Sequence, residues 1–291
     1  MSELGYLRSP KLKAEAPLPQ SEAEVSTKKV EVLAETPEEE LLTTREAISK
    51  EELAGGVNVT KLLSLKDDGR AIFKPMEGES WSRDNIDEGT YFQRERAAYL
   101  VDRICGFNLI PPTVIRTEEG KIGSCQQFVE SGKTTTEELY ENMRQRFNTD
   151  DVLDIEFEEF QQLKAEPFVR YSEDFKRLYA LDYILWNSDR HNDNFLIKDG
   201  KIIPIDHGLC FGNAKPLFAN EPFDQPFPAD VIEKLQGVVA DTEKVELLRV
   251  ELKKHLTDTE VAACVMRIKK LALILSKHGQ IPRQSAGDLT Y

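Results

Sequence analysis

The amino-acid sequence predicts an α+β protein with a β-rich N-terminal lobe over residues 51–130 and a helical C-terminal lobe over residues 131–291. The N-terminal lobe holds strand-like segments separated by turn residues, with one helical pattern among them. The C-terminal lobe holds apolar residues at helical spacing, interrupted by one hairpin pattern. Residues 1–50 begin with a stretch rich in Ala, Glu, Pro, Ser and Lys, and we expect a disordered acidic tail there. Within it, residues 38–53 have the pattern of a short amphipathic helix.

Turn residues and helix stops define the elements of the N-terminal lobe. The predicted elements are strands at 57–65 and 70–75, a helix at 90–105, and two further strands between 113 and 130. Asp67-Asp68-Gly69 is typical of a hairpin turn between the first two strands. Gly106 stands where a helix commonly ends. Two strands, a helix and two strands therefore make a small mixed lobe.

The C-terminal lobe is predicted from helical spacing and from capping residues. Its predicted elements are a weakly helical acidic stretch at 131–170, a helix at 172–186, a hairpin at 195–205 and helices over 229–278. Ser172 is a plausible cap for the helix that follows it. Thr257 with Glu260 forms a capping-box pattern, and Gly279 is a natural helix stop.

Composition excludes several classes of function. The chain has 291 residues and a net charge of −14, which disfavours binding to a nucleic-acid backbone. No segment approaches the roughly 18 apolar residues that a membrane helix needs, and the N-terminus lacks the pattern of a secretory signal. The four cysteines form no C-x-x-C pair, so we expect buried free thiols and a reducing, cytoplasmic location.

Polar residues around the predicted hairpin point to phosphoryl transfer. Asp189 and Asn194 are five residues apart, and the hairpin at 195–205 then delivers Asp206 twelve residues after Asn194. Phosphoryl transfer needs carboxylate and amide oxygens that hold Mg²⁺, and an acidic group that orients the attacking hydroxyl. A hairpin between the two metal ligands would bring them to one cleft. The alternative is that these residues only cap loops and turns.

A lysine and a glutamate in the N-terminal lobe complete the pattern. Lys74 ends the predicted strand at 70–75, where a strand-borne lysine can reach the phosphates of ATP. Glu95 lies on the inward stripe of the helix at 90–105 and is the candidate partner that holds Lys74 in place. The alternative for both residues is an ordinary solvent-facing charge.

These motifs together resemble the phosphatidylinositol 3- and 4-kinase family, and within it the type II and plant gamma 4-kinases. The resemblance covers roughly residues 55–215. It rests on the runs Ala71-Ile72-Phe73-Lys74-Pro75, Arg94-Glu95, Pro111-Pro112-Thr113, Asn187-Ser188-Asp189-Arg190, Asn192-Asp193-Asn194 and Ile205-Asp206. The catalytic loop and Phe211-Gly212 are also similar to those of the Fam20 secretory kinases.

The resemblance implies a two-lobed protein-kinase-like fold and an ATP- and Mg²⁺-dependent transfer of the γ-phosphoryl group to a hydroxyl. It implies that Lys74 binds the phosphates, that Glu95 anchors Lys74, that Asp189 is the catalytic aspartate and that Asn194 and Asp206 hold Mg²⁺. A phosphate-covering loop is implied at Gly55, Gly56 and Asn58. An adenine-binding hinge is implied at Gln127, Phe128, Val129 and Glu130. His191 and His207 could contact the phosphoryl group, although structural hydrogen bonding is the favoured role for each.

The acceptor and the activity itself stay open at this point. The family favours a phosphoinositide acceptor, whereas the acidic charge and the compact size favour a protein. The acidic insert at 137–166 suggests a basic acceptor. One alternative to an active kinase is a pseudokinase that acts as a nucleotide-binding interaction module. Another is an acidic interaction protein without an ATP site. The sequence does not predict the oligomeric state.

Overall fold

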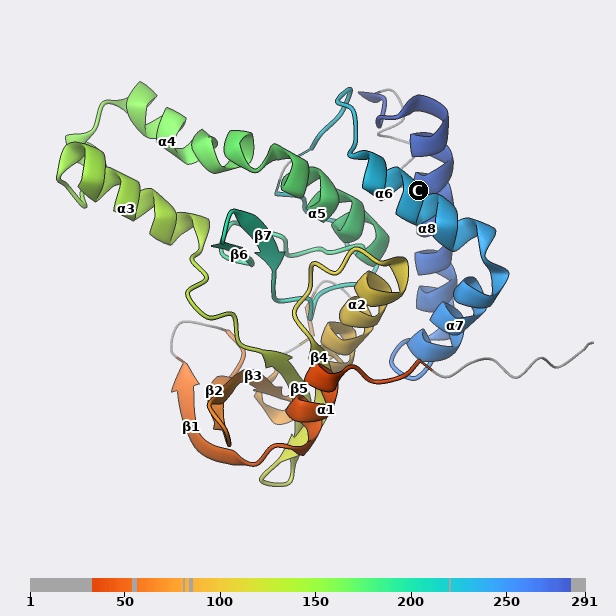
Figure 1. Ribbon diagram of the computed structural model, residues 1–291. Coiled ribbons are helices and arrows are strands. Elements are labelled where there is room, and N and C mark those ends of the chain that lie inside the picture. The colour runs from red at the N-terminus through yellow and green to blue at the C-terminus, as the bar shows by residue number, and fades with distance from the viewer. Residues whose placement is uncertain (1–32, 54–56, 81, 84–85, 220, 284–291) are drawn as a thin grey trace, which may run out of the picture. The chain divides into compact units, whose positions relative to one another are not determined.

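The computed structural model describes residues 33–53, 57–80, 82–83, 86–219 and 221–283. The described elements all belong to one compact unit (Figure 1). An antiparallel sheet forms its N-terminal part, and helices dominate its C-terminal part. The predicted α+β fold class is therefore confirmed, whereas the boundary between the lobes at residue 130 stays a prediction.

The N-terminal sheet has five strands in the order β1-β2-β3-β5-β4. Their bounds are β1 (Ala47–Leu53), β2 (Thr60–Leu65), β3 (Gly69–Pro75), β4 (Thr113–Glu118) and β5 (Lys121–Gln127). Asp67 and Asp68 turn β2 into β3 with φ values of 60° and 59°, as their turn pattern predicted. One face of the sheet buries a cluster that includes Leu63, Phe73 and Cys125.

The segment before the sheet is more ordered than its composition suggested. Helix α1 (Pro37–Thr44) and strand β1 (Ala47–Leu53) both begin before residue 51, where we expected the folded lobe to start. The carboxylate of Glu39 is fully buried and accepts hydrogen bonds from Arg96 and Arg103. These long-range bonds and the pairing of β1 with β2 order residues that the sequence assigned to a tail. The helix pattern at 38–53 also breaks at residue 44, and a strand follows.

Helix α2 (Tyr91–Cys105) joins the two parts of the fold. It contacts β4 and β5, and also the later helices α5 (Ser172–Leu185), α6 (Ala229–Ala240) and α7 (Thr242–Leu252). Its first turn is capped by the Glu79 carboxylate, which accepts the backbone N–H groups of Tyr91 and Phe92. Gly106 ends it with a φ of 78°, a conformation that glycine adopts without strain.

The loop after α2 is held by one buried carboxylate. The side chain of Asp102 accepts hydrogen bonds from the backbone N–H groups of Leu109 and Ile110, at 2.9 and 3.0 Å. Burial raises the pKa of Asp102 to about 7, although these hydrogen bonds act in the opposite direction. The folded protein thus keeps the Asp102 proton up to a pH at which the unfolded chain has lost it.

We expect this carboxyl group to weaken folding as the pH rises. An unfolded aspartate titrates near pH 4, so the unfolded chain loses this proton first and the free energy of unfolding falls from about pH 4 to pH 7. By linkage the fall reaches about 4 kcal/mol, at about 1.4 kcal/mol for each pH unit. The asparagine side chain in Asp102→Asn cannot ionise, so the free energy of unfolding of this variant should not show this fall between about pH 4 and pH 7. Urea unfolding of both proteins at pH 4.5, 6 and 7.5 measures the difference. The exposed-turn variant Asp68→Asn is the control, and a pH-independent difference between wild type and Asp102→Asn would contradict the assignment.

The C-terminal part contains helices and one two-stranded sheet. Its elements are α3 (Thr135–Phe147), α4 (Phe157–Arg170), α5 (Ser172–Leu185), β6 (Phe195–Lys198), β7 (Lys201–Pro204), α6 (Ala229–Ala240), α7 (Thr242–Leu252) and α8 (Asp258–His278). Thr257 and Glu260 form the predicted capping box, and Gly279 ends α8 with a φ of 65°. Ser172 is the first residue of α5 rather than its cap, because α4 runs almost directly into α5. The largest core joins α2 with α5, α6, α7 and α8.

The acidic stretch at 131–170 forms two full helices rather than weak helical structure. In Figure 1, α3 and α4 run side by side and extend away from the other helices. They share a small apolar cluster of Met143, Ile155 and Leu163. The two helices therefore bury apolar side chains between them, which their polar composition did not predict.

Two further features agree with the sequence. All four cysteines are buried and free. Among the described residues, no helix has both the length and the apolar character that a membrane crossing requires.

Candidate active site

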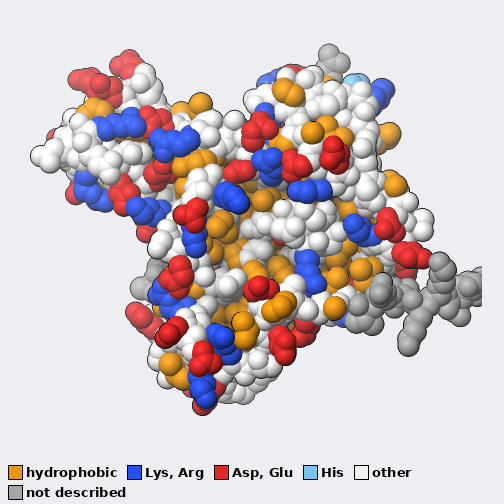
Figure 2. Space-filling view, in the orientation of Figure 1, with side chains coloured by type: hydrophobic (Ala, Val, Ile, Leu, Met, Phe, Trp, Pro, Cys, Tyr) orange, Lys and Arg blue, Asp and Glu red, His pale blue; other side chains and the backbone are white. Residues whose placement is uncertain are grey.

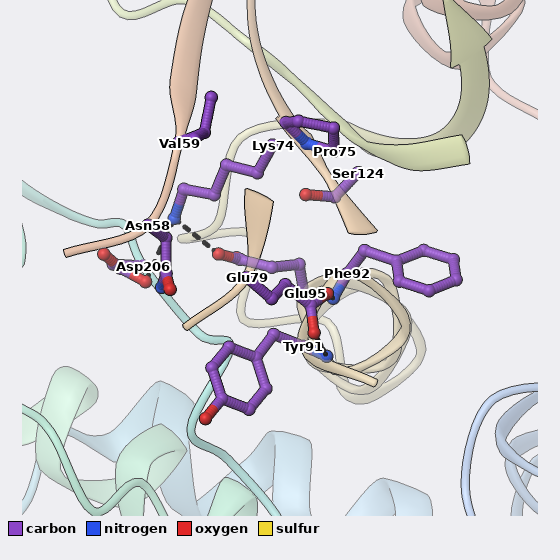
Figure 3. Close-up of a pocket in the computed structure, with 11 residues that line it drawn as sticks. Asn58, Val59, Lys74, Pro75, Glu79, Tyr91, Phe92, Glu95, Ser124 and Asp206 are labelled. Atoms are coloured by element: carbon purple, nitrogen blue, oxygen red, sulfur yellow. Dashed lines mark hydrogen bonds and ion pairs between the residues drawn. The ribbon is translucent and has the colours of Figure 1, made fainter. Parts of the chain in front are cut away.

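Three segments that are far apart in the sequence meet at Lys74. The Nζ atom of Lys74 on β3 lies 2.6 Å from Glu95 Oε1 on α2 and 3.0 Å from Asp206 Oδ1, which follows β7. Figure 3 shows Lys74 reaching from its strand toward these carboxylates. The structure therefore brings together three of the residues that the sequence selected.

Strand packing explains why Lys74 can take this position. Lys74 pairs with Ser124, and Pro75 pairs with Gly123 on the neighbouring strand β5. A Cβ atom on Gly123 would lie 2.3 Å from the carbonyl oxygen of Lys74, so only glycine allows the two strands to approach this closely. The fit between β3 and β5 thus fixes the end of the strand that carries Lys74.

The contacts around Lys74 and Glu95 keep these two groups charged. Burial lowers the pKa of Lys74, but the Asp206 and Glu95 carboxylates outweigh it, so the net shift is upward. Burial raises the pKa of Glu95, but Lys74 and His207 outweigh that effect, and the net shift is downward. The Glu95 carboxylate also accepts the backbone N–H of His207 at 3.0 Å. Glu95 therefore ties β3 to the segment after β7.

Asp206 occupies a special backbone conformation. Its φ is 58°, in the left-handed region that side chains other than glycine rarely adopt. Its side chain is 43% exposed although it contacts the largely buried Lys74–Glu95 pair. A non-glycine residue in this region stores strain that the surrounding contacts must outweigh, and such residues concentrate at functional sites.

Asp189 and Asn194 lie in one loop between α5 and β6. The side-chain amide of Asn194 donates to the carbonyl oxygen of Asp189 at 2.8 Å. The backbone N–H of Asp189 donates to the side chain of Asn187 at 2.9 Å. The first bond uses a side-chain N–H of Asn194, and the second fixes the backbone of Asp189.

A buried arginine fixes this loop to the helix before it. Arg190 forms a two-pronged ion pair with Asp182 on α5, at 2.9 and 3.0 Å, and both side chains are almost completely buried. Arg190 also donates to the carbonyl oxygens of Asn194 and Ile205. One guanidinium group therefore connects helix α5, the end of the loop at Asn194 and Ile205, the residue that precedes Asp206.

An arginine before α2 contacts Asp189. Nη2 of Arg83 lies 2.8 Å from Asp189 Oδ1. The backbone of Arg83 pairs with Ile86, which is fully buried against Tyr91 and Leu209. The candidate catalytic carboxylate is thus paired with a cation from the segment that follows β3.

The remaining predicted residues are placed as follows. Asn58 borders the pocket beside Lys74, and its side chain accepts the backbone N–H of Ser80 at 2.7 Å. Gly55 and Gly56 lie outside the described residues. Gln127 ends β5, and Phe128, Val129 and Glu130 follow it; all four line a different hollow, which shares no residue with the pocket beside Lys74. Their role as an adenine hinge stays a prediction.

The two histidines differ in their surroundings. His207 is fully buried, burial lowers its pKa, and its Nε2 lies 3.1 Å from Nη2 of Arg190. His191 is exposed, and its Nδ1 accepts the backbone N–H of Asp193. Both geometries agree with structural hydrogen bonding.

The donor atoms near Asp206 fit a magnesium ion that is also held by a nucleotide. Among the described residues, no cluster of three or more His, Cys, Asp or Glu side chains could hold a metal by itself. Asn194 and Asp206 supply one amide oxygen and one carboxylate. Mg²⁺ commonly takes one or two protein oxygens and completes its shell with phosphate oxygens and water. The residues present therefore fit a metal that binds together with phosphates.

Sequence reasoning gave no role to Glu79, Arg83, Asp182 or Arg190. Asp182 and Arg190 carry a detectable pattern, because an aspartate near the end of the predicted helix precedes the Asp189-Arg190 pair by seven residues. Glu79 and Arg83 carry none, since they lie in a polar segment whose path depends on contacts with α2 and with Asp189.

Comparison with known sequences decides the family. The sequence model of the family described as phosphatidylinositol 3- and 4-kinase matches residues 89–264, which is more than half of the chain. The chain belongs to this family. The matched range contains Glu95, Asp189, Asn194 and Asp206, whereas Lys74 lies before it.

A curated protein and two solved structures extend the comparison. Protein Rv2133c of Mycobacterium tuberculosis is 29% identical over 194 residues, which are 58% of this chain and 67% of that protein. The Golgi casein kinase with Mn/ADP bound has a TM-score of 0.52 at 17% identity and covers 80% of this chain and 73% of its own. Hydra Fam20 with sugar has a TM-score of 0.52 at 15% identity and covers 82% and 87%.

At these identities the solved structures show the fold alone. They confirm the kinase-like α+β fold, and the family match confirms the resemblance to phosphatidylinositol 3- and 4-kinases. Family and fold together support a kinase-like phosphotransferase.

Proposed function

We propose that this chain is an active ATP- and Mg²⁺-dependent kinase that transfers the γ-phosphoryl group to a hydroxyl. The observation that carries the proposal is the convergence of Lys74, Glu95 and Asp206 from three separate segments, with the Asp189–Asn194 loop fixed by Arg190. A solved kinase of this fold carries Mn/ADP, which supports a nucleotide and a divalent cation as cofactors.

Each residue has a defined task in this proposal. Lys74 binds phosphate oxygens of ATP as a fixed cation, and Glu95 keeps its ammonium group in place. Asp189 accepts the proton of the acceptor hydroxyl at a carboxylate oxygen and orients that hydroxyl. Asn194 and Asp206 would hold Mg²⁺, which when bound supplies charge that neutralises the phosphates. Asn58, with Gly55 and Gly56, would cover the phosphates, and Gln127 to Glu130 would hold the adenine.

The acceptor is a phosphoinositide or a protein. Family membership supports the lipid. The acidic insert at 137–166 supports a basic protein, although some of its carboxylates already pair with basic side chains. Glu138, Glu141 and Glu166 pair with Arg170, Lys133 and Arg146. A cytoplasmic location is part of the proposal, and the four free cysteines support it.

The test is ATP turnover by purified protein with Mg²⁺, with phosphoinositide vesicles and separately with a protein mixture as acceptors. We expect wild-type transfer to one acceptor class, and a loss of about 10²- to 10⁴-fold in Asp189→Asn, the range that a positioned general base contributes. Asp206→Asn should lose turnover and Mg²⁺-dependent nucleotide binding together. Asp68→Asn, in an exposed turn, is the matched control.

The outcomes separate the alternatives. Nucleotide binding without transfer to either acceptor would favour the pseudokinase interaction module. Absence of nucleotide binding by the wild type would favour an interaction protein without an ATP site.

A further inference from the structure

A second hollow lies apart from the pocket beside Lys74. It measures about 430 Å³ and is bordered by the loop 108–112, the segment 127–130 and the β6–β7 hairpin, with Asp174 at its edge. Figure 2 shows this face, where apolar side chains gather between the sheet and the helices and basic side chains stand nearby. Its size falls in the range of small-molecule sites, roughly 300–1,000 Å³.

More than half of the lining residues are apolar, and hydrogen bonds hold the walls in place. Apolar side chains line it from all three segments: Leu109, Pro111, Pro112, Val129, Ile202 and Ile203. The Asp102 carboxylate holds the backbone of Leu109 and Ile110, and the N–H of Gln127 donates to the carbonyl of Pro112 at 2.8 Å. The cavity is therefore formed before any ligand arrives, and binding would require little reorganisation.

The carboxylates at the edge of the hollow already have cationic partners. Glu130 is paired with Arg70, whose guanidinium also lies 4.3 Å from the centre of the Phe128 ring. Asp174 is paired with Arg177 at 3.0 Å. Neither carboxylate is free to attract a cationic ligand.

The two lysines at the edge have no such partners. Lys198 and Lys201 lie directly opposite each other in the β6–β7 ladder, on either side of the two-residue turn. Like charges at opposed positions of a hairpin destabilise it. Within the described ranges no carboxylate forms an ion pair with either lysine, and Asp199 in the turn between them is exposed. An anion bound at the hollow would relieve this repulsion.

We infer that this hollow is a binding site for a small amphipathic anion, with an apolar body against the walls and a carboxylate, sulfonate or phosphate at Lys198 and Lys201. The site does not depend on the proposed kinase activity. If Gln127 to Glu130 form the adenine hinge, this segment borders both sites, and competition with ATP distinguishes them.

The probe is 8-anilinonaphthalene-1-sulfonate, an aromatic anion whose fluorescence rises in apolar sites. We expect saturable binding to the full-length wild type that persists at saturating ATP and Mg²⁺. Lys198→Ala/Lys201→Ala should weaken it at least tenfold. The control Lys269→Ala/Lys277→Ala removes the same charge from exposed positions of α8 and should leave the affinity unchanged. Ile203→Glu, which puts a carboxylate in the hollow, should weaken binding without a change in far-ultraviolet circular dichroism.

Two results would overturn the inference. One is equal loss of affinity in the two double-lysine variants, which would mean that net charge alone attracts the probe. The other is complete displacement of the probe by ATP, which would place it in the nucleotide cleft. Loss of kinase activity in any variant would concern only the proposed function. It would not change the interpretation of the probe-binding measurement.

Discussion

Replacing Lys74 with methionine is expected to lower ATP turnover at least 100-fold while the protein stays folded. Methionine keeps most of the length of the side chain but removes the ammonium group. Among the described ion pairs, this is the only cation that contacts both Glu95 and Asp206. Fixed charges aimed at transferring phosphoryl groups are among the largest single contributions to catalysis. Steady-state turnover and the nucleotide dissociation constant should be measured together, so that binding and transfer are separated.

A double variant separates catalysis from stability. Lys74→Met leaves the 5% exposed Glu95 side chain without its cation, and an unpaired buried charge destabilises the fold. Lys74→Met/Glu95→Gln removes that charge, so we expect a higher melting temperature than in Lys74→Met and no recovery of turnover. Lys121→Met, at an exposed position of β5, is the control. Turnover above a tenth of the wild-type value in Lys74→Met would show that another group binds the phosphates.

Replacing Arg190 with methionine should destabilise the protein by about 3–5 kcal/mol, the range for breaking a buried ion pair from one side. The variant leaves the Asp182 carboxylate, which is 1% exposed, without its cation. It also removes the donors to the carbonyl oxygens of Asn194 and Ile205. For a chain of this size we expect the melting temperature to fall by about 10 °C, since each kcal/mol shifts it by about 2–4 °C.

Two further proteins test the cause of that loss. Asp182→Leu/Arg190→Met replaces both charges with apolar groups and should be more stable than Arg190→Met. It should nevertheless remain inactive, because the loop that carries Asp189 and Asn194 has lost its anchor. Arg146→Met breaks an exposed pair with Glu166 and should change stability by less than about 1 kcal/mol. A similar loss in Arg146→Met and Arg190→Met would contradict the argument from burial.

Local patterns predicted the parts of the fold that local interactions decide. The Asp67-Asp68-Gly69 turn, the Gly106 and Gly279 stops and the capping box at Thr257 all act within a few residues. The spacing of Asp189, Asn194 and Asp206 around a hairpin was also visible in the sequence, and with it the loop of the candidate site.

Long-range contacts decided what the sequence could not predict. The order of α1 and β1 depends on Glu39 meeting Arg96 and Arg103, about sixty residues away. The pairing of Arg83 with Asp189 spans 106 residues, and nothing in the local sequence distinguishes Arg83 from other loop arginines. The helices α3 and α4 owe their stability to packing against each other, which their polar composition does not reveal.

The buried Glu39 has a practical consequence for anyone who shortens this protein. A variant that starts at residue 51 would lack both Glu39 and most of β1. Arg96 lies next to Glu95 in the chain, and Arg103 lies two turns further along the same helix, so both would lose their shared carboxylate. A protein that starts at residue 51 would therefore lose the contacts that Arg96 and Arg103 make from α2, the helix that carries Glu95. A shortened protein intended for crystallisation or assay should keep residues 33–50.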